Sequence, residues 1–177
     1  MILPILIALG VIGLIFVVAI AGQPDEFVVS RSATILAPAE KVFQHVNDLH
    51  KWEDWSSWAK LDPDAKSSFS GADSGSGAAM AWDGNKKVGA GKMTILESQP
   101  GERIRLKLEF IRPFQATNKA EFNFKSESGQ TVVTWTMTGK SNFFFKVFGL
   151  FKNCDAMVGR DFEKGLASLK SVVEATR

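Results

Sequence analysis

The sequence predicts an α+β fold in which a curved antiparallel sheet grips one long C-terminal helix. Two observations carry this prediction: extended segments joined by tight turns follow Ala78, and a long amphipathic helical pattern ends the chain. An antiparallel sheet with one apolar face needs a cover, and this helix is the long amphipathic element that can provide it. A strand and two short helices precede the sheet, and an apolar segment precedes them all.

The apolar segment, residues 1–22, contains no charged side chain. As a helix rising about 1.5 Å per residue it would extend about 33 Å, which is enough to cross the core of a bilayer. We therefore predict a transmembrane anchor over residues 1–22, a short linker over residues 23–26 and a separate domain over residues 27–177.

Two other interpretations of this segment remain open. Ala19, Ile20 and Ala21 have the small-x-small pattern of a signal-peptidase site, so residues 1–22 could be a cleaved signal peptide. The absence of Lys and Arg before the apolar run, and its length of about 20 residues against the usual 7 to 15, argue for the anchor. A buried core helix is the third interpretation, although no amphipathic face marks a side for a core.

The flanks of the segment give a weak indication of membrane orientation. Basic residues accumulate on the cytoplasmic side of membrane helices, and here the first basic residue after the apolar run is Arg31. The intervening residues include Asp25 and Glu26. This favours a single-pass membrane protein with a translocated domain, on the periplasmic or extracellular side.

The domain is expected to open with a strand and short helices. Residues 26–37 are rich in β-branched side chains, and Pro38 then suits the first turn of a short helix. Trp52, Trp55 and Trp58 follow at a spacing of three residues, which places them on one side of a helical turn. The polar, glycine-rich residues 67–77 predict a loop.

Five short segments of extended type then predict a meander of strands. In the third of them Ile104, Leu106, Leu108 and Phe110 alternate with charged residues, so one face of the sheet is apolar and the other is polar. The five segments are residues 78–82, 91–98, 102–113, 114–125 and 130–139.

The C-terminal residues 143–177 have a helical pattern. Val158, Phe162, Leu166, Leu169 and Val173 recur at spacings of four, four, three and four, which indicates a single apolar stripe on a long helix.

Composition excludes some classes of partner and cofactor. The 21 basic and 19 acidic residues are spread along the chain, which argues against nucleic acid as a partner. A single cysteine, Cys154, rules out an intramolecular disulfide and a cysteine-based metal cluster within one chain. The oligomeric state is not indicated by the sequence.

Four sequence segments together resemble a known family. In chain order they are APAEKVF with the three spaced tryptophans, GKMTILES, VTWTMTG and DFEKGLASLK. The chain resembles the SRPBCC superfamily, also called START-like or Bet v 1-like, and in particular its bacterial polyketide cyclase/dehydrase and lipid transport branch. The resemblance covers residues 27 to 174 and rests on the order and spacing of the segments.

The resemblance implies a helix-grip fold with a cavity for a hydrophobic ligand between the sheet and the C-terminal helix. Lipid carriers, quinone-binding chaperones, aromatase/cyclases and oxygenase subunits all occur in this superfamily, so the fold leaves the function open.

The proton-transfer inventory of the sequence is short. The chain has no tyrosine and two histidines, His45 and His50, which have no metal-ligand spacing to each other or to nearby carboxylates. We expect no catalytic residues, no metal and no cofactor.

The ligand cavity is expected to be lined by inward-facing side chains of the strands and by the helix stripe. For Trp135 and Met137 the facing is open, because Val132, Thr134 and Thr136 form a rival alternation. The candidate ligand-binding residues are Trp82, Met93, Ile95, Leu106, Leu108, Phe110, Phe122, Phe124, Trp135, Met137, Phe162 and Leu166.

Two aromatic clusters are candidates for a pocket lid or a membrane contact, with packing against the sheet rim as the alternative. They comprise Trp52, Trp55 and Trp58 in the first cluster and Phe144, Phe148 and Phe151 in the second.

Three functions are compatible with these features. The first is a membrane-anchored carrier or binding protein for a lipid, a quinone or a polyketide-like compound. The second is a cyclase/dehydrase-type enzyme acting on an aromatic or polyketide-like substrate. The third is a protein-interaction module. The anchor and the missing catalytic set favour the first.

Overall fold

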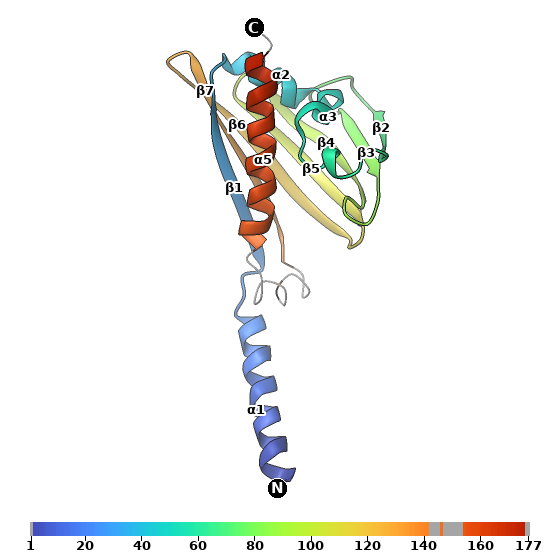
Figure 1. Ribbon diagram of the computed structural model, residues 1–177, viewed down its shortest axis with the longest axis vertical. Coiled ribbons are helices and arrows are strands. Elements are labelled where there is room, and N and C mark those ends of the chain that lie inside the picture. The colour runs from blue at the N-terminus through green and yellow to red at the C-terminus, as the bar shows by residue number, and fades with distance from the viewer. Residues whose placement is uncertain (1, 142–145, 147–153, 176–177) are drawn as a thin grey trace.

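The computed structural model describes residues 2–141, 146 and 154–175. A seven-stranded antiparallel sheet curves around a long C-terminal helix, and the N-terminal helix projects away from the domain (Figure 1). This is the α+β, helix-grip architecture that the sequence predicts.

The strands lie in the order β1-β7-β6-β5-β4-β3-β2, so each strand except β1 has a sequence neighbour beside it. The register pairs Glu26 with Lys140, Phe110 with Ala116 and Asp83 with Ala90, which gathers these strand ends at one end of the sheet. The strands are β1 (Glu26–Ile35), β2 (Lys66–Ser70), β3 (Ala79–Asp83), β4 (Ala90–Gln99), β5 (Arg103–Arg112), β6 (Ala116–Glu127) and β7 (Gln130–Lys140).

The predicted loop over residues 67–77 is wrong at residues 67–70, which belong to strand β2. All five residues of β2 are exposed, and they pair with β3 from Lys66 opposite Asp83 to Ser70 opposite Ala79. An edge strand held by backbone hydrogen bonds needs no apolar face, so its polar side chains carry no alternation to recognise.

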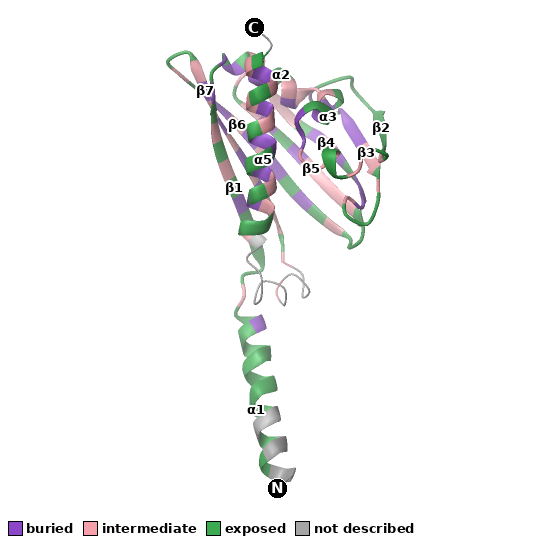
Figure 2. Cartoon of the chain, viewed as in Figure 1, coloured by how far each residue is buried: buried purple, intermediate pink, exposed green. Residues whose placement is uncertain are grey.

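Helix α5 (Cys154–Ala175) fills the concave side of the sheet. Phe162, Leu166, Leu169 and Val173 are fully buried, and Val158 packs against the same core, which confirms the predicted stripe. Figure 2 shows the buried residues along the side of α5 that faces the sheet.

The structure resolves the open question on β7. Val133, Trp135 and Met137 point into the domain and are buried, whereas Thr134 and Thr136 are partly exposed and bond to serines of β1 across the outer face. The bulky inner residues meet β6, where Trp135 lies opposite Phe122. Burial of the larger apolar set decides the facing.

Short helices cover the end of the domain at which β1 finishes. They are α2 (Ala39–Asn47), the 3-10 turn η1 (Leu49–Lys51), α3 (Trp52–Trp55) and the 3-10 turn η2 (Ala59–Leu61). The indoles of Trp52 and Trp55 donate hydrogen bonds to the carbonyls of Val46 and His45, at 2.9 and 3.1 Å. Both rings are therefore held against α2, and their remaining surface is buried in the core.

Helix α1 (Ile2–Ala21) has no acidic or basic residue in its first or last turn. From Ile7 to Val18 its described side chains are exposed, and at Ile20 burial begins. Among the described residues, the structure contains no helix that combines the length and the apolarity of a membrane-crossing segment. The transmembrane segment predicted for residues 1–22 finds no support in that result and stays a prediction.

The contact between α5 and the sheet generates a stability prediction. Leu166 is fully buried in this contact, so Leu166→Ala should lower the free energy of unfolding by about 2–5 kcal/mol. The exposed Lys164→Ala, two positions away, should change it by less than about 0.5 kcal/mol. Urea unfolding monitored by tryptophan fluorescence measures both, and equal effects of the two variants would contradict the packing described.

Candidate ligand-binding cavity

A cavity of about 1020 Å³ lies between the concave face of the sheet, α3 and α5. Sheet residues form most of its deep wall, and α3 and α5 supply the rest. The deep wall consists of Met80, Met93, Leu106, Leu108, Ala120, Trp135 and Met137 from the strands, Trp52 from α3, and Phe162 from α5. This lining is apolar, which suits a hydrophobic molecule.

The floor of the cavity is a stack of aromatic rings centred on Trp135. The indole stacks on Phe162 with centroids 3.9 Å apart and planes 4° apart, and on Phe122 at 4.8 Å. Trp52, Trp55 and Trp58 meet the same indole edge-on at 5.7 to 6.3 Å. Contacts on both faces and along the edges leave this ring little freedom to move, so the floor is rigid.

Two glycines allow the large side chains to fit. A Cβ on Gly165 of α5 would lie 3.1 Å from Cζ3 of Trp135, so a side chain at this position would push the helix and the indole apart by a few tenths of an ångström. A Cβ on Gly139 of β7 would lie 2.1 Å from Oδ1 of Asn118. The second clash is with a buried amide and would displace it.

Few polar groups lie in or beside the deep wall, and one of them, the indole N–H of Trp135, is buried without a hydrogen-bond partner. Ser56 and Asn118 are buried, and the Asn118 amide makes a long contact of 3.8 Å to the sulfur of Met137. Neither side chain titrates near neutral pH, so this part of the cavity offers hydrogen bonds and no general acid or base.

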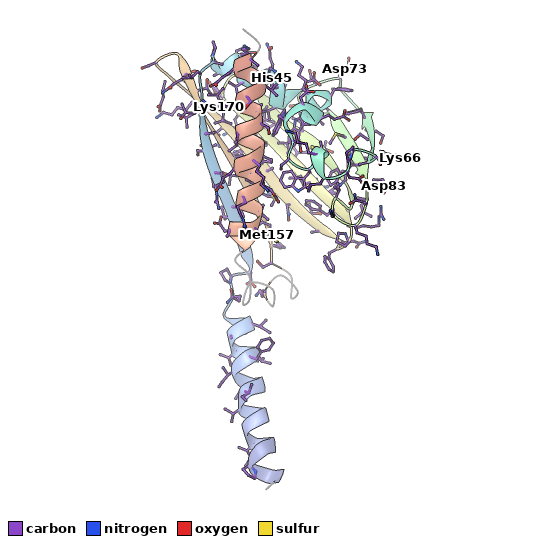
Figure 3. The ribbon with its side chains drawn as sticks, viewed as in Figure 1. His45, Lys66, Asp73, Asp83, Met157 and Lys170 are labelled. Carbon is purple, nitrogen blue, oxygen red and sulfur yellow. The ribbon has the colours of Figure 1, made fainter. Side chains whose placement is uncertain are left out.

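The cavity opens at the end of the domain from which α1 leaves. With the exception of Glu53, its exposed wall residues belong to segments that meet there. The tip of the β5–β6 hairpin, Arg112 to Phe114, forms one side, and Met157 in the first turn of α5 forms another. Figure 3 shows Met157 at this end of α5. The rim is more polar than the floor, because Lys87, Arg112 and other charged residues belong to it.

An arginine holds the start of α5 against β1. Arg31 donates two hydrogen bonds to the Asp155 carboxylate, at 2.9 and 3.0 Å, and one to Glu163 at 2.8 Å. The guanidinium lies over Gly159, where any Cβ would be 2.0 Å from Nη2. The hydrogen bonds from Arg31 hold the pKa of Asp155 below its ordinary value. Because Asp155 and Val158 line the mouth, this ion pair fixes one wall of the opening.

Neither histidine lies in the cavity wall. His45 is partly buried and contacts the Lys41 carbonyl through Nδ1, while His50 is exposed and stacks on Phe69. In the described ranges no three His, Cys, Asp or Glu side chains are grouped so that they could hold a metal ion.

Eight of the twelve candidate ligand-binding residues lie in the cavity wall. These are Trp82, Met93, Leu106, Leu108, Phe110, Trp135, Met137 and Phe162. The other four, Ile95, Phe122, Phe124 and Leu166, are buried core residues outside the wall. Contact of any of them with a ligand stays a prediction.

The proposed lid residues have different locations. Trp52 and Trp58 line the cavity, whereas Trp55 is completely buried beneath it, so Trp55 is a core residue. Phe144, Phe148 and Phe151 lie outside the described residues.

Several wall residues were not identified from the sequence. Met80 could have been found, because it lies two residues before the candidate Trp82 in the predicted strand 78–82 and therefore shares its face. Ser56 and Asn118 carry no such signal, since a polar residue in a strand or loop is ordinarily exposed. Pro113 and Phe114 were assigned to strands, and only the tertiary structure places them at the cavity mouth.

Comparisons with known proteins agree with this architecture. A family model described as "Polyketide cyclase / dehydrase and lipid transport" matches residues 26–174. No curated protein sequence is detectably similar to the chain.

Solved structures share the fold at low sequence identity. Protein CV1439 from Chromobacterium violaceum is 17% identical with a TM-score of 0.59, and the alignment covers 85% of this chain and 99% of that one. Ara h 8.0201 is 10% identical with a TM-score of 0.58, with coverage of 85% and 99%. The di-domain ARO/CYC BexL from the BE-7585A biosynthetic pathway is 15% identical with a TM-score of 0.61, with coverage of 91% and 54%.

The Arg31–Asp155 pair generates a pH prediction. The pKa of Asp155 is lower in the folded chain than in the unfolded one, so its contribution to stability is complete above about pH 4 and disappears as the pH falls through the lower, folded-state pKa. Asp155→Asn should therefore lose less stability than the wild type when the pH falls from about 6 to about 2. Urea midpoints at both pH values measure this, with the exposed Asp54→Asn as control. Identical pH dependence in wild type and Asp155→Asn would contradict the pairing.

Proposed function

Because the chain belongs to the polyketide cyclase / dehydrase and lipid transport family, we propose that it is a membrane-anchored protein that binds a hydrophobic small molecule. The observation that carries this proposal is the apolar cavity of about 1020 Å³ between the sheet and α5. Ligand pockets commonly measure about 300–1,000 Å³, so this one is large enough for a lipid, a quinone or a polyketide-like compound.

The chemistry of the wall supports binding of an apolar skeleton. Methionines from three strands, Met80, Met93 and Met137, face the same space as Leu106 and Leu108. Methionine side chains are flexible and polarisable, so they adapt to ligands of differing outline, while the stacked rings of the floor stay fixed. A cavity with one adaptable and one rigid wall suits a carrier for a class of related molecules.

Helix α1 supports the anchor. Its sequence has no charged residue, and eight large apolar side chains between Ile7 and Val18 are exposed. Apolar surface of this extent is unfavourable in water and favourable in a bilayer. The first basic residue after the helix is Arg31, and a flank without nearby Lys or Arg favours placing the domain on the translocated side.

The enzymatic alternative draws support from the family description and from the likeness to BexL. The polar groups at the deep wall are Ser56, Asn118 and the unpaired indole N–H of Trp135, which can orient a carbonyl but cannot transfer a proton at neutral pH. Conversion of the extracted ligand into a product by the purified protein would favour this alternative over a carrier.

The proposal is tested by identifying the small molecules that copurify with the protein. Mass spectrometry of compounds extracted from the full chain in mild detergent should detect a hydrophobic molecule that a denatured control does not retain. Extracts that are consistently empty would contradict the proposal and leave the protein-interaction alternative.

A cavity-filling substitution tests the location of the site. Ala120 lines the cavity and its neighbour Lys119 points outward, so the two positions of β6 form a matched pair. Ala120→Phe should weaken binding of the dye 1-anilinonaphthalene-8-sulfonate at least about tenfold, which corresponds to about 1.4 kcal/mol. Lys119→Phe should leave the affinity unchanged. A fluorescence titration measures both, and unaltered binding by a folded Ala120→Phe variant would place the site elsewhere.

Charges placed in α1 test the anchor. Each acidic side chain at the centre of a membrane helix costs about 2.5–3.5 kcal/mol, so Ile12→Asp with Ile15→Asp should move much of the chain out of the carbonate-washed membrane fraction. The exposed Ser126→Asp on β6 is the control and should leave the distribution unchanged. A double variant that remains in the membrane would contradict the anchor.

A further inference from the structure

The mouth of the cavity is surrounded by large exposed apolar side chains. Ile111 and Phe114 at the tip of the β5–β6 hairpin are 57% and 52% exposed, and Met157 in the first turn of α5 is 49% exposed. Isolated apolar residues on a surface are ordinary, but Phe114 and Met157 line one opening from two sides, and Ile111 is next to Arg112 of the same rim. These exposed side chains give the opening an apolar edge.

The covalent structure places a bilayer there if α1 is the anchor. Four residues, Gly22 to Asp25, separate the end of α1 from the start of β1, and they can extend about 14 Å at most. The start of β1, the ends of β5 and β7 and the start of β6 are gathered at the end of the sheet where this linker enters. In Figure 1 the β5–β6 hairpin and the start of α5 both lie at the end of the domain nearest α1.

The charges around the mouth argue against a purely electrostatic contact. Lys86 and Lys87 are exposed in the β3–β4 turn, but Arg112 pairs with Asp83 and Lys146 pairs with Asp25. Acidic and basic groups therefore alternate along the rim. The apolar side chains remain as the feature suited to insertion among lipid head groups and acyl chains, where aromatic and aliphatic residues are stabilised.

We propose that the open end of the domain is a membrane-docking surface, with Ile111, Phe114 and Met157 inserted into the interface of a phospholipid bilayer. The cavity then opens onto the bilayer, so a hydrophobic ligand passes between lipid and protein without crossing water. This inference rests on the proposed anchor and ligand cavity and adds the orientation of the domain. Because the rim charges are mixed, docking depends little on anionic lipid or on salt.

Site-directed fluorescence on the full chain tests the orientation. In a Cys154→Ser background, single cysteines from Phe114→Cys, Met157→Cys and Ser128→Cys are labelled with a nitrobenzoxadiazole dye and reconstituted into phosphatidylcholine vesicles. Ser128, in the β6–β7 turn at the opposite end of the sheet, is the control. Nitroxide-labelled lipid should quench the dyes at positions 114 and 157 at least twofold more than the dye at position 128.

A second variant tests the apolar contact itself. Ile111 lies outside the cavity wall, and Ile111→Asp should reduce the quenching at position 157 at least twofold by expelling the hairpin tip from the lipid. Adding anionic lipid or 0.5 M salt should change the quenching by less than twofold.

The outcomes separate this inference from the function on which it rests. Equal quenching at positions 114, 157 and 128 in a chain that floats with vesicles and binds the dye of the cavity assay overturns the docking and leaves the carrier proposal intact. A blue shift at position 114 that appears without lipid and grows with protein concentration indicates a second copy on this surface and also overturns it. A chain that does not float with the vesicles overturns both the anchor and the docking.

Discussion

The structure depends on one constraint: the concave apolar face of a seven-stranded sheet is wider than the single helix that covers it. Helix α5 packs against β1 and α3, and Phe162, Leu166, Leu169 and Val173 fill the space beneath it. The inner residues of β3 to β5 lie beyond this contact, and Met80, Met93 and Leu108 line open space instead. A helix-grip domain therefore leaves a cavity wherever no second element replaces the missing cover.

Much of the fold could be predicted because burial leaves a periodic trace in the sequence. The alternation around Leu106 and the stripe through Phe162 and Leu166 both result from residues facing one core. Strand β2 could not be found in this way, since its five exposed residues are held by backbone pairing with β3 alone. The facing of Trp135 was ambiguous because both faces of β7 carry β-branched or aromatic residues.

The cavity was predicted less completely than the core for a related reason. A side chain that lines a cavity and one that fills a core have the same periodicity, so Met93 and Ile95 look alike in the sequence but differ in the structure. Which of them faces open space depends on where α5 ends and how far the sheet curves. The polar residues Ser56 and Asn118 are buried by tertiary contacts that no local pattern encodes.

The same constraint links the cavity to the N-terminal helix. Pairing of β1 with β7, together with the ion pairs from Arg31 to Asp155 and Glu163, fixes the start of α5 beside the start of β1. Four residues separate α1 from the first strand, so the mouth bounded by α5 and the β5–β6 hairpin must open near the attachment point of that helix. The position of the opening thus follows from strand order and one salt-bridged arginine, whereas the identity of the ligand depends on side chains deeper in the cavity.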